Sequence, residues 1–227
     1  MTIRQDIRAI VFDMDGVLID SHPTHRAAWR EFLQSVGIDA GDPELEFILE
    51  GRTRNEILRH FLGDLPEPEL QVYGQRKDEI FRSMEHDIQP LTGVLRFLSK
   101  LEMAGIARAV ATSASEIRTF ATLERMGLGG YFDAVITAAD VTTGKPHPMV
   151  YHLACERMNV RAPHAVAFDD ACAGVQAARS AGMRCIGVAS NGSSAKLREA
   201  GAETIIPDFS GLELPWLESL VEQTLPT

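Results

Sequence analysis

Residues 12–17 read FDMDGV, and a mostly apolar run at residues 8–11 leads into them. An apolar run that ends in turn residues is typical of a buried parallel strand, so we expect a strand that opens into a tight loop. Asp13 and Asp15 are two positions apart, and in an extended chain both side chains would leave the same face. Two carboxylates that close repel unless a proton or a cation relieves them. A divalent metal bound through oxygen would do so, although a solvated Asp-Gly turn is the alternative for this motif alone.

The chain of 227 residues is long enough for one large α/β domain or for a domain with an insertion. Its net charge of −10 argues against nucleic acid or an anionic membrane as the main partner. Cys155, Cys172 and Cys185 form no CxxC pair, and we expect reduced thiols. Neither a leader pattern nor an apolar run of membrane length occurs in the sequence. These observations predict a cytoplasmic protein that binds neither nucleic acid nor membrane.

The segment from residue 19 to residue 88 shows helical periodicity and no strand pattern. Ser21 or His22 is expected to cap its first helix, which Gly37 would end. We therefore predict an all-helical cap domain at residues 19–88, inserted into a core domain made of residues 1–18 and 89–227. The expected helices of the insertion are residues 23–36, a short one from residue 42, residues 57–62 and residues 66–85.

From Pro90 onward, strand patterns alternate with helical patterns. Such alternation implies a parallel sheet with right-handed crossovers. The predicted fold class is α/β, a doubly wound Rossmann-like parallel sheet with an inserted all-helical cap. Its later strands are predicted at 107–112, 134–136, 165–168, 184–188 and 204–206, with helices at 93–104, 115–126, 148–158, 173–180, 195–200 and 212–221.

Polar residues follow two of these expected strands, just as Asp13 and Asp15 follow the first strand. Thr112 and Ser113 end one strand, Asp169 and Asp170 end another, and Lys145 lies in a proline-rich loop between them. The carboxyl ends of parallel strands share one edge of the sheet, so these groups should meet the first two aspartates there. Each hydroxyl could instead be an ordinary strand-end group or a helix cap.

A site with four carboxylates is costly without a bound cation. Mg²⁺ suits oxygen ligands and usually keeps a substrate phosphate among them. Hydroxyls and the N–H groups of a helix start can hold an anion, and a lysine adds charge for the same anion. Phosphoryl transfer through an aspartyl phosphate is the chemistry that uses all of these groups.

Four motifs in this order resemble those of the haloacid dehalogenase superfamily: residues 13–17, Thr112–Ser113, Lys145–Pro146 and Asp169–Asp170. The helical insertion after the first motif resembles the small cap of the branch that contains beta-phosphoglucomutase and phosphoglycolate-type phosphatases. The resemblance covers essentially the whole chain.

The resemblance implies a role for each core residue. Asp13 would be the nucleophile, and Asp15 would be the acid that protonates the leaving oxygen and then the base that activates the next acceptor. Thr112 would hydrogen-bond the transferring phosphoryl group, and Lys145 would balance its charge against Asp13. The Mg²⁺ ligands would be the carboxylates of Asp13, Asp169 and Asp170 and the backbone carbonyl of Asp15. The second aspartate also argues for phosphate chemistry, because the dehalogenases of the superfamily lack it.

Residues of the cap are similar to those with which beta-phosphoglucomutase orients its sugar phosphate. His25, Arg54 and Lys77 are the matching positions, and Gly16 and Ser113 would also contact substrate. Other interpretations are a surface position for His25, a solvated helix start for Arg54 and a solvated charged face for Lys77. Trp29 is expected in the core. The chain departs from the superfamily at Ala171, where a serine is usual, and we expect a slightly altered Mg²⁺ affinity there.

The sequence therefore predicts a Mg²⁺-dependent phosphatase of a small phosphorylated metabolite, with a sugar phosphate as the expected substrate. A phosphomutase of the beta-phosphoglucomutase kind is the alternative that uses the same core. A non-catalytic sensor of a phosphorylated metabolite is the alternative from another class. A monomer is expected, because no long exposed apolar stripe demands a partner.

Overall fold

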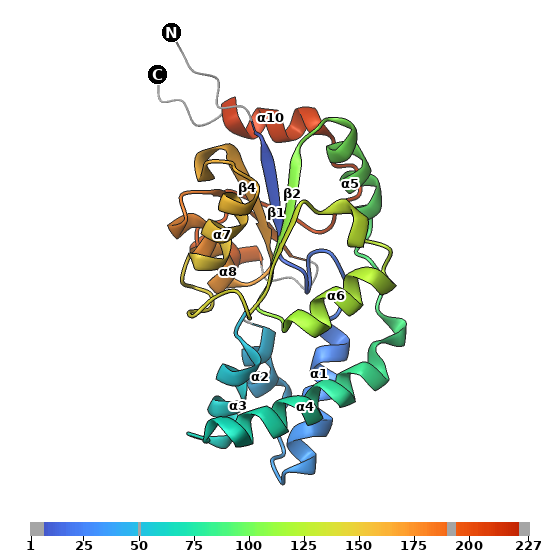
Figure 1. Ribbon diagram of the computed structural model, residues 1–227, viewed down its shortest axis with the longest axis vertical. Coiled ribbons are helices and arrows are strands. Elements are labelled where there is room, and N and C mark those ends of the chain that lie inside the picture. Colours follow the sequence, from blue (N-terminus) through green and yellow to red (C-terminus); the bar gives the residue numbers. More distant parts are fainter. Residues whose placement is uncertain (1–6, 50, 190–193, 223–227) are drawn as a thin grey trace.

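The computed structural model describes residues 7–49, 51–189 and 194–222. Its centre is a six-stranded parallel sheet in the order β3-β2-β1-β4-β5-β6, which confirms the predicted fold class (Figure 1). The first strand thus lies in the middle, between the two strands that end in predicted site residues. The strands are β1 Ala9–Phe12, β2 Ala107–Ala111, β3 Ala134–Ile136, β4 Ala165–Asp169, β5 Arg184–Val188 and β6 Thr204–Ile206.

The register of the strands brings the functional ends level. Phe12 at the end of β1 is paired with Val110 of β2 and with Phe168 of β4. The next residue, Asp13, donates its backbone N–H to the Phe168 carbonyl at 2.9 Å. Asp13 and Asp169 therefore leave adjacent strands at the same height.

Each face of the sheet packs against its own helices. Along β1, Ile10 and Phe12 belong to one buried cluster, and Ala9 and Val11 belong to another. Because side chains alternate across a strand, these two clusters lie on opposite faces of the sheet, and both faces must be apolar. The helices of this part are α5 Val94–Met103, α6 Glu116–Arg125, α7 Met149–Arg157, α8 Cys172–Ser180, α9 Ser194–Glu199 and α10 Leu214–Glu222.

After β1 the chain leaves the sheet, forms a separate group of helices and returns to the sheet before α5 (Figure 1). It has its own apolar cluster, built around Trp29, Phe32, Leu58 and Leu70. The helices are α1 His22–Ser35, α2 Asp42–Leu45, α3 Arg54–Leu62 and α4 Glu67–Met84, with short 3-10 turns η1 Glu46–Leu49 and η2 Glu85–Asp87. The remaining 3-10 turns, η3 Gly129–Tyr131 and η4 Ala162–His164, lie in the sheet domain.

The two segments that connect these helices to the sheet are hydrogen-bonded to each other. The Asp20 N–H donates to the Gln89 carbonyl at 3.0 Å, and the Leu91 N–H donates to the Leu18 carbonyl at 3.0 Å. The predicted domain boundaries lie beside these contacts, and the division into two domains stays a prediction. The inserted helices therefore meet the sheet domain through two neighbouring tethers.

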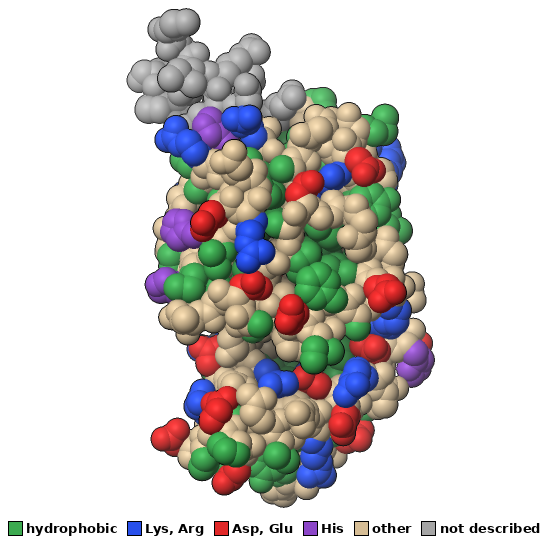
Figure 2. Space-filling model, viewed as in Figure 1, with side chains coloured by type: hydrophobic (Ala, Val, Ile, Leu, Met, Phe, Trp, Pro, Cys, Tyr) green, Lys and Arg blue, Asp and Glu red, His purple; other side chains and the backbone are tan. Residues whose placement is uncertain are grey.

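The surface carries charges of both signs. On the face drawn in Figure 2, Lys, Arg, Asp and Glu side chains are interspersed. Among the helices that the structure describes, none combines the length and the apolar character needed to cross a bilayer. Cys155, Cys172 and Cys185, all of them described residues, form no disulfide bond with one another.

Candidate active site

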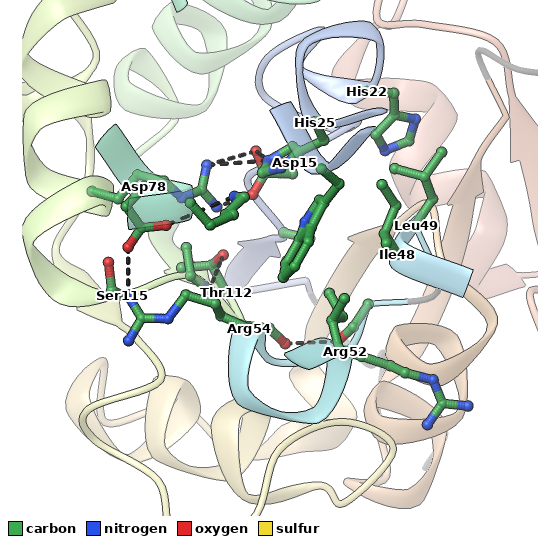
Figure 3. A pocket seen from close by; sticks show the side chains of 18 of the residues that line it. Asp15, His22, His25, Ile48, Leu49, Arg52, Arg54, Asp78, Thr112 and Ser115 are labelled. Carbon is green, nitrogen blue, oxygen red and sulfur yellow. Dashed lines mark hydrogen bonds and ion pairs between the residues drawn. The ribbon is translucent and has the colours of Figure 1, made fainter. Parts of the chain in front are cut away.

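A pocket lies at the carboxyl edge of the sheet, between the strand ends and the inserted helices (Figure 3). It brings together residues that are far apart in the sequence, and it includes most of the predicted site residues. From the sheet domain its lining includes Asp13, Asp15, Thr112, Ser113, Arg118 and Asp170, and from the inserted helices it includes His25, Trp29, Arg54, Lys77 and Asp78.

Lys145 joins two of the strand-end carboxylates. Its Nζ donates to Asp13 Oδ1 at 2.7 Å and to Asp169 Oδ2 at 2.8 Å, and the lysine is buried. Burial opposes the charge on Lys145, but Asp13 and Asp169 outweigh it and raise the pKa of the ammonium group. The lysine therefore stays charged at neutral pH and fixes both carboxylates at the end of the sheet.

A single lysine does not neutralise this cluster of acids. Burial, and then the negative charges of Asp169, Asp170 and Asp15, raise the pKa of Asp13 from 3.8 to about 8, although Lys145 acts in the opposite direction. Burial likewise raises the pKa of Asp170. The excess negative charge is the kind that a bound cation relieves.

The donor set fits a hard cation such as Mg²⁺, because it consists of carboxylate oxygens on adjacent strand ends. Within residues 7–49, 51–189 and 194–222, no three His, Cys, Asp or Glu side chains are already grouped as metal ligands. Lys145 occupies one oxygen each of Asp13 and Asp169, and His22 lies 2.8 Å from Asp170 Oδ2. Metal binding would therefore use the remaining oxygens or displace His22.

Asp169 is held from three sides. Besides Lys145, the hydroxyl of Tyr151 donates to Asp169 Oδ2, and the backbone N–H of Ala171 donates to Asp169 Oδ1 at 3.0 Å. Ala171 thus supplies its backbone donor, and the side chain that replaces the usual serine makes no helix cap for α8. Gly174 is required here, because a Cβ at that position would lie 1.9 Å from Asp169 Oδ2.

Asp15 accepts hydrogen bonds from three side chains. The donors are Ser21 Oγ at 2.6 Å, His25 Nε2 at 3.2 Å and the two terminal nitrogens of Arg118, of which Nη1 is 3.0 Å from Oδ1. Figure 3 shows His25 beside Asp15. Burial opposes the charge on this carboxylate, but Arg118 and then His25 outweigh it and hold the pKa of Asp15 well below its usual value. Asp15 is therefore an ionised, fixed carboxylate in this state.

Ser21 is the N-cap residue of α1, which agrees with the prediction that Ser21 or His22 caps the first helix. Its hydroxyl makes no capping hydrogen bond, however, and donates to Asp15 instead. His22 lies against Asp170, which outweighs burial and raises the pKa of the imidazole. A hydrogen bond to an ionised carboxylate is stronger than one to a neutral group, so the Ser21 hydroxyl and the His22 imidazole contact carboxylates rather than the start of the helix.

Gly16 shapes the turn after β1. Its φ is +73°, and a Cβ there would lie 2.1 Å from Asp170 Oδ2 and 2.5 Å from His22 Nε2. Both the left-handed backbone and the close approach require glycine. Gly16 is not among the residues that line the pocket, and its contact with substrate stays a prediction.

Thr112 and Ser113 follow β2 on the floor of the pocket. Thr112 is buried, and its hydroxyl accepts from the Ala114 N–H at 3.1 Å. Ser113 Oγ donates to the Gly51 carbonyl at 2.8 Å, which joins the end of β2 to the loop before α3. Ser115, not Ser113, is the residue that precedes α6, so the helix-cap interpretation of Ser113 is wrong.

Lys77 is buried, with 3% of its surface exposed, and the solvated-face interpretation is wrong. Its Nζ lies 5.2 Å from the centre of the Trp29 ring and 4.9 Å from that of Phe81. Burial, and then the nearby Arg118, lower the pKa of Lys77 from 10.5 to about 8. Trp29 is in the apolar core, as predicted, and it also lines the pocket.

His25 is not a surface residue. It stacks on Phe81 with ring centres 4.5 Å apart, and burial lowers its pKa from 6.5 to about 4.

Arg54 is the first residue of α3, and its side chain is partly exposed. It also pairs with Asp78 Oδ2 and lines the pocket. Gly74 of α4 leaves room for this arginine, because a Cβ there would lie 2.5 Å from Arg54 Nε.

Sequence reasoning did not assign Ser21, His22, Arg118 and Tyr151 to this site. For Arg118 a signal exists, because a basic residue in the first turn of a helix opposes the helix dipole and therefore suggests a specific partner. His22 and Tyr151 gave no such signal, since their contacts depend on how α1 and α7 pack against the strand ends.

Comparison with known proteins agrees with this geometry. The family model described as hydrolase, haloacid dehalogenase-like hydrolase, matches residues 7–182. Fructose-1-phosphate phosphatase YqaB of Escherichia coli is 36% identical over 182 residues, which are 79% of this chain and 95% of that protein. Beta-phosphoglucomutase of Bacillus subtilis is 27% identical, with 96% of each chain covered.

Solved structures show the same fold. Beta-phosphoglucomutase from Clostridium difficile superposes with a TM-score of 0.86 and 26% identity, and the match covers 96% of this chain and 98% of that one. CbbY from Rhodobacter sphaeroides, solved in complex with phosphate, superposes with a TM-score of 0.78 and 30% identity, covering 91% and 96%. With the site, the fold and these matches in agreement, the chain belongs to the haloacid dehalogenase-like hydrolase family.

Proposed function

We propose that this protein is a Mg²⁺-dependent phosphatase of a small phosphorylated metabolite, and that its substrate is a sugar phosphate. The observation that carries the proposal is the pairing of Asp13 with Lys145 beside a second, separately held carboxylate, Asp15, in one pocket. Relatives whose names include fructose-1-phosphate phosphatase and phosphorylated carbohydrates phosphatase support the substrate class.

In the first step a carboxylate oxygen of Asp13 attacks phosphorus, and the bond to the leaving oxygen breaks. Asp15 is ionised in the state described above, so it must take up a proton when the substrate binds; it then gives that proton to the leaving oxygen, and an alcohol leaves. In the second step Asp15 takes a proton from water, which attacks the aspartyl phosphate and releases inorganic phosphate. Lys145 stays beside Asp13 in both steps and offsets the charge of the phosphoryl group.

Mg²⁺, when bound, would supply positive charge against the phosphoryl oxygens. The carboxylates of Asp13, Asp169 and Asp170 and the backbone carbonyl of Asp15 would hold it. The inserted helices would cover the substrate, since the Ser113–Gly51 contact joins them to the floor of the pocket. A hydroxyl-rich substrate suits this pocket, because its walls offer Arg54, Lys77 and Asp78 as polar partners.

A phosphomutase is the second candidate, and its support is the likeness to beta-phosphoglucomutases over nearly the whole chain. In that reaction the phosphoryl group of Asp13 would pass to another hydroxyl of the sugar instead of to water. The core residues would have the same roles, and only the acceptor would differ.

The test is phosphate release from a panel that includes fructose 1-phosphate and β-glucose 1-phosphate, with Mg²⁺ and with chelator, for wild type and Asp13→Asn. Release that requires both the metal and Asp13 supports the phosphatase. Phosphorus NMR of the same mixtures detects isomerised sugar phosphate, which would favour the mutase. Binding without turnover of any member would leave the metabolite sensor as the remaining candidate.

A further inference from the structure

Arg118 binds Asp15 from the sheet domain, in a fork that engages both carboxylate oxygens. Nη1 donates to Oδ1 at 3.0 Å, and Nη2 donates to Oδ2. The side chain is 10% exposed, so the pair is largely shielded from water. A buried bidentate pair of this kind fixes the orientation of the carboxylate as well as its charge.

The location of Arg118 is unfavourable for an arginine without a specific partner. It stands in the first turn of α6, which begins at Glu116, and a cation there opposes the helix dipole. Side chains of a helix tilt toward its N-terminus, which here is the end of α6 nearest the strand ends. The guanidinium is thereby directed at Asp15, and the carboxylate offsets the cost of its position.

The inserted helices support the same contact from the other side. Phe81 of α4 lies under the guanidinium of Arg118, with 5.2 Å from Cζ to the ring centre. The ring of Phe81 also stacks on His25, the other nitrogen donor to Asp15. A displacement of α4 would therefore disturb both donors at once.

The contacts also distinguish the two oxygens of Asp15. Oδ1 accepts from Ser21, His25 and Arg118. Among the contacts between described residues, Oδ2 accepts from Arg118 alone. Each carboxylate oxygen has two lone pairs, so Oδ2 keeps one that can carry a proton.

We propose that Arg118 is a positioning residue for proton transfer by Asp15: its fork holds the carboxylate in one orientation when Phe81 of α4 is in place beside it. The inference rests on the proposed function. Asp15 is ionised in the present state, so the step requires that it first takes up a proton from water when the substrate binds. As the bond from Asp13 to phosphorus forms and the ester bond breaks, that proton passes to the leaving oxygen, and the resulting carboxylate is stabilised by the fork. Water later returns a proton to Asp15.

The experiment compares two leaving groups. A sugar phosphate needs a proton on its leaving oxygen, whereas p-nitrophenyl phosphate and acetyl phosphate have leaving groups that depart as anions. We expect Arg118→Ala to lower kcat/KM for the sugar phosphate by about 100-fold, a size typical of lost general acid catalysis. For the activated ester that wild type turns over, the loss should be within about threefold, since proton transfer is not needed.

The ratio kcat/KM is the correct quantity, because it reports only the steps up to departure of the leaving group. Arg118→Lys keeps the charge and loses the fork, so it should recover only part of the sugar-phosphate activity. This variant also keeps the test decisive if Arg118→Ala does not fold. Arg125→Ala is the matched control, since Arg125 lies on the same helix and contacts the backbone carbonyl of Glu85 instead of Asp15.

Equal losses on both substrates would overturn the inference, because they would mean that Arg118 supports the fold or the phosphoryl group in general. A rise in KM with unchanged kcat would also overturn it and would make Arg118 a substrate-binding group. Wild-type enzyme that hydrolyses neither substrate would instead refute the proposed function itself.

Discussion

Lys145 Nζ and Asp13 Oδ1 are 2.7 Å apart, and this contact joins the loop after β3 to the end of β1. Asp169 lies on the other side of the same ammonium group. The lysine thus compensates two buried carboxylates at once. Its removal should affect folding as well as catalysis.

We expect Lys145→Met to lower the free energy of unfolding by about 3–5 kcal/mol in chelator, because it leaves buried charges unpaired. Adding Asp13→Asn to this variant should restore part of the loss, since one of those charges is then gone. Denaturant unfolding of the two single variants and the double variant measures the coupling. Strictly additive effects would contradict the pairing.

Mg²⁺ should raise the unfolding temperature of the chelated wild-type protein, because a ligand that binds the native state stabilises it. Asp170→Asn should abolish most of this shift, since it removes one of the proposed ligands. Differential scanning fluorimetry over a Mg²⁺ titration makes the measurement. Asp39→Asn is the control, because Asp39 is exposed in the loop between α1 and α2, and its shift should equal that of wild type.

Lys77 predicts a pH dependence of stability at alkaline pH. Burial lowers its pKa from 10.5 to about 8, so between these values the unfolded chain binds the proton more strongly than the native one. The contribution of Lys77 to stability should therefore rise with pH across this window, by about 3 kcal/mol in total. Lys77→Met lacks the group, and its unfolding free energy should rise less from pH 8 to pH 10.5. Parallel curves for the two proteins would refute the low pKa.

Gly16→Ala should unfold the protein or remove its activity, because the new Cβ would meet Asp170 Oδ2 at 2.1 Å. Gly37→Ala is the matched control. Gly37 also has a positive φ, of +83°, but a Cβ there meets nothing within 4 Å. The control should cost only the strain of the left-handed backbone, about 1–3 kcal/mol. Equal losses of stability in both variants would mean that the close approach to Asp170 has no effect.

The sequence predicted the architecture well, because the apolar strands and the periodic helices leave few alternatives. The strand at 184–188 has the predicted bounds, and the helix of residues 67–84 lies within one residue of the prediction at each end. The strand-end acids and Lys145 could be predicted because all parallel strands end at one edge. The place of each of these residues in the fold follows from its position relative to the predicted strands, without knowledge of any other contact.

The partners of these residues could not be predicted from one sequence. Lys77 stands among charged neighbours and reads as a solvated residue, yet the packing of α1 against α4 buries it beside Trp29. The sequence position of Ser21 suggests a helix cap, but its hydroxyl donates a hydrogen bond to the carboxylate of Asp15 instead. Such contacts depend on how separate elements meet, which local pattern does not encode.

The two tethers between the sheet and the inserted helices have a consequence for how such a chain can diversify. Since the backbone N–H of Leu91 donates a hydrogen bond to the Leu18 carbonyl, the chain leaves the sheet domain and re-enters it at one place. A segment of another shape could join at that place without altering the strand order or the register of Asp13 beside Asp169. An exchange of the inserted helices between relatives would therefore leave the sheet intact, but it would also replace His25 and Phe81, which contact Asp15 and Arg118.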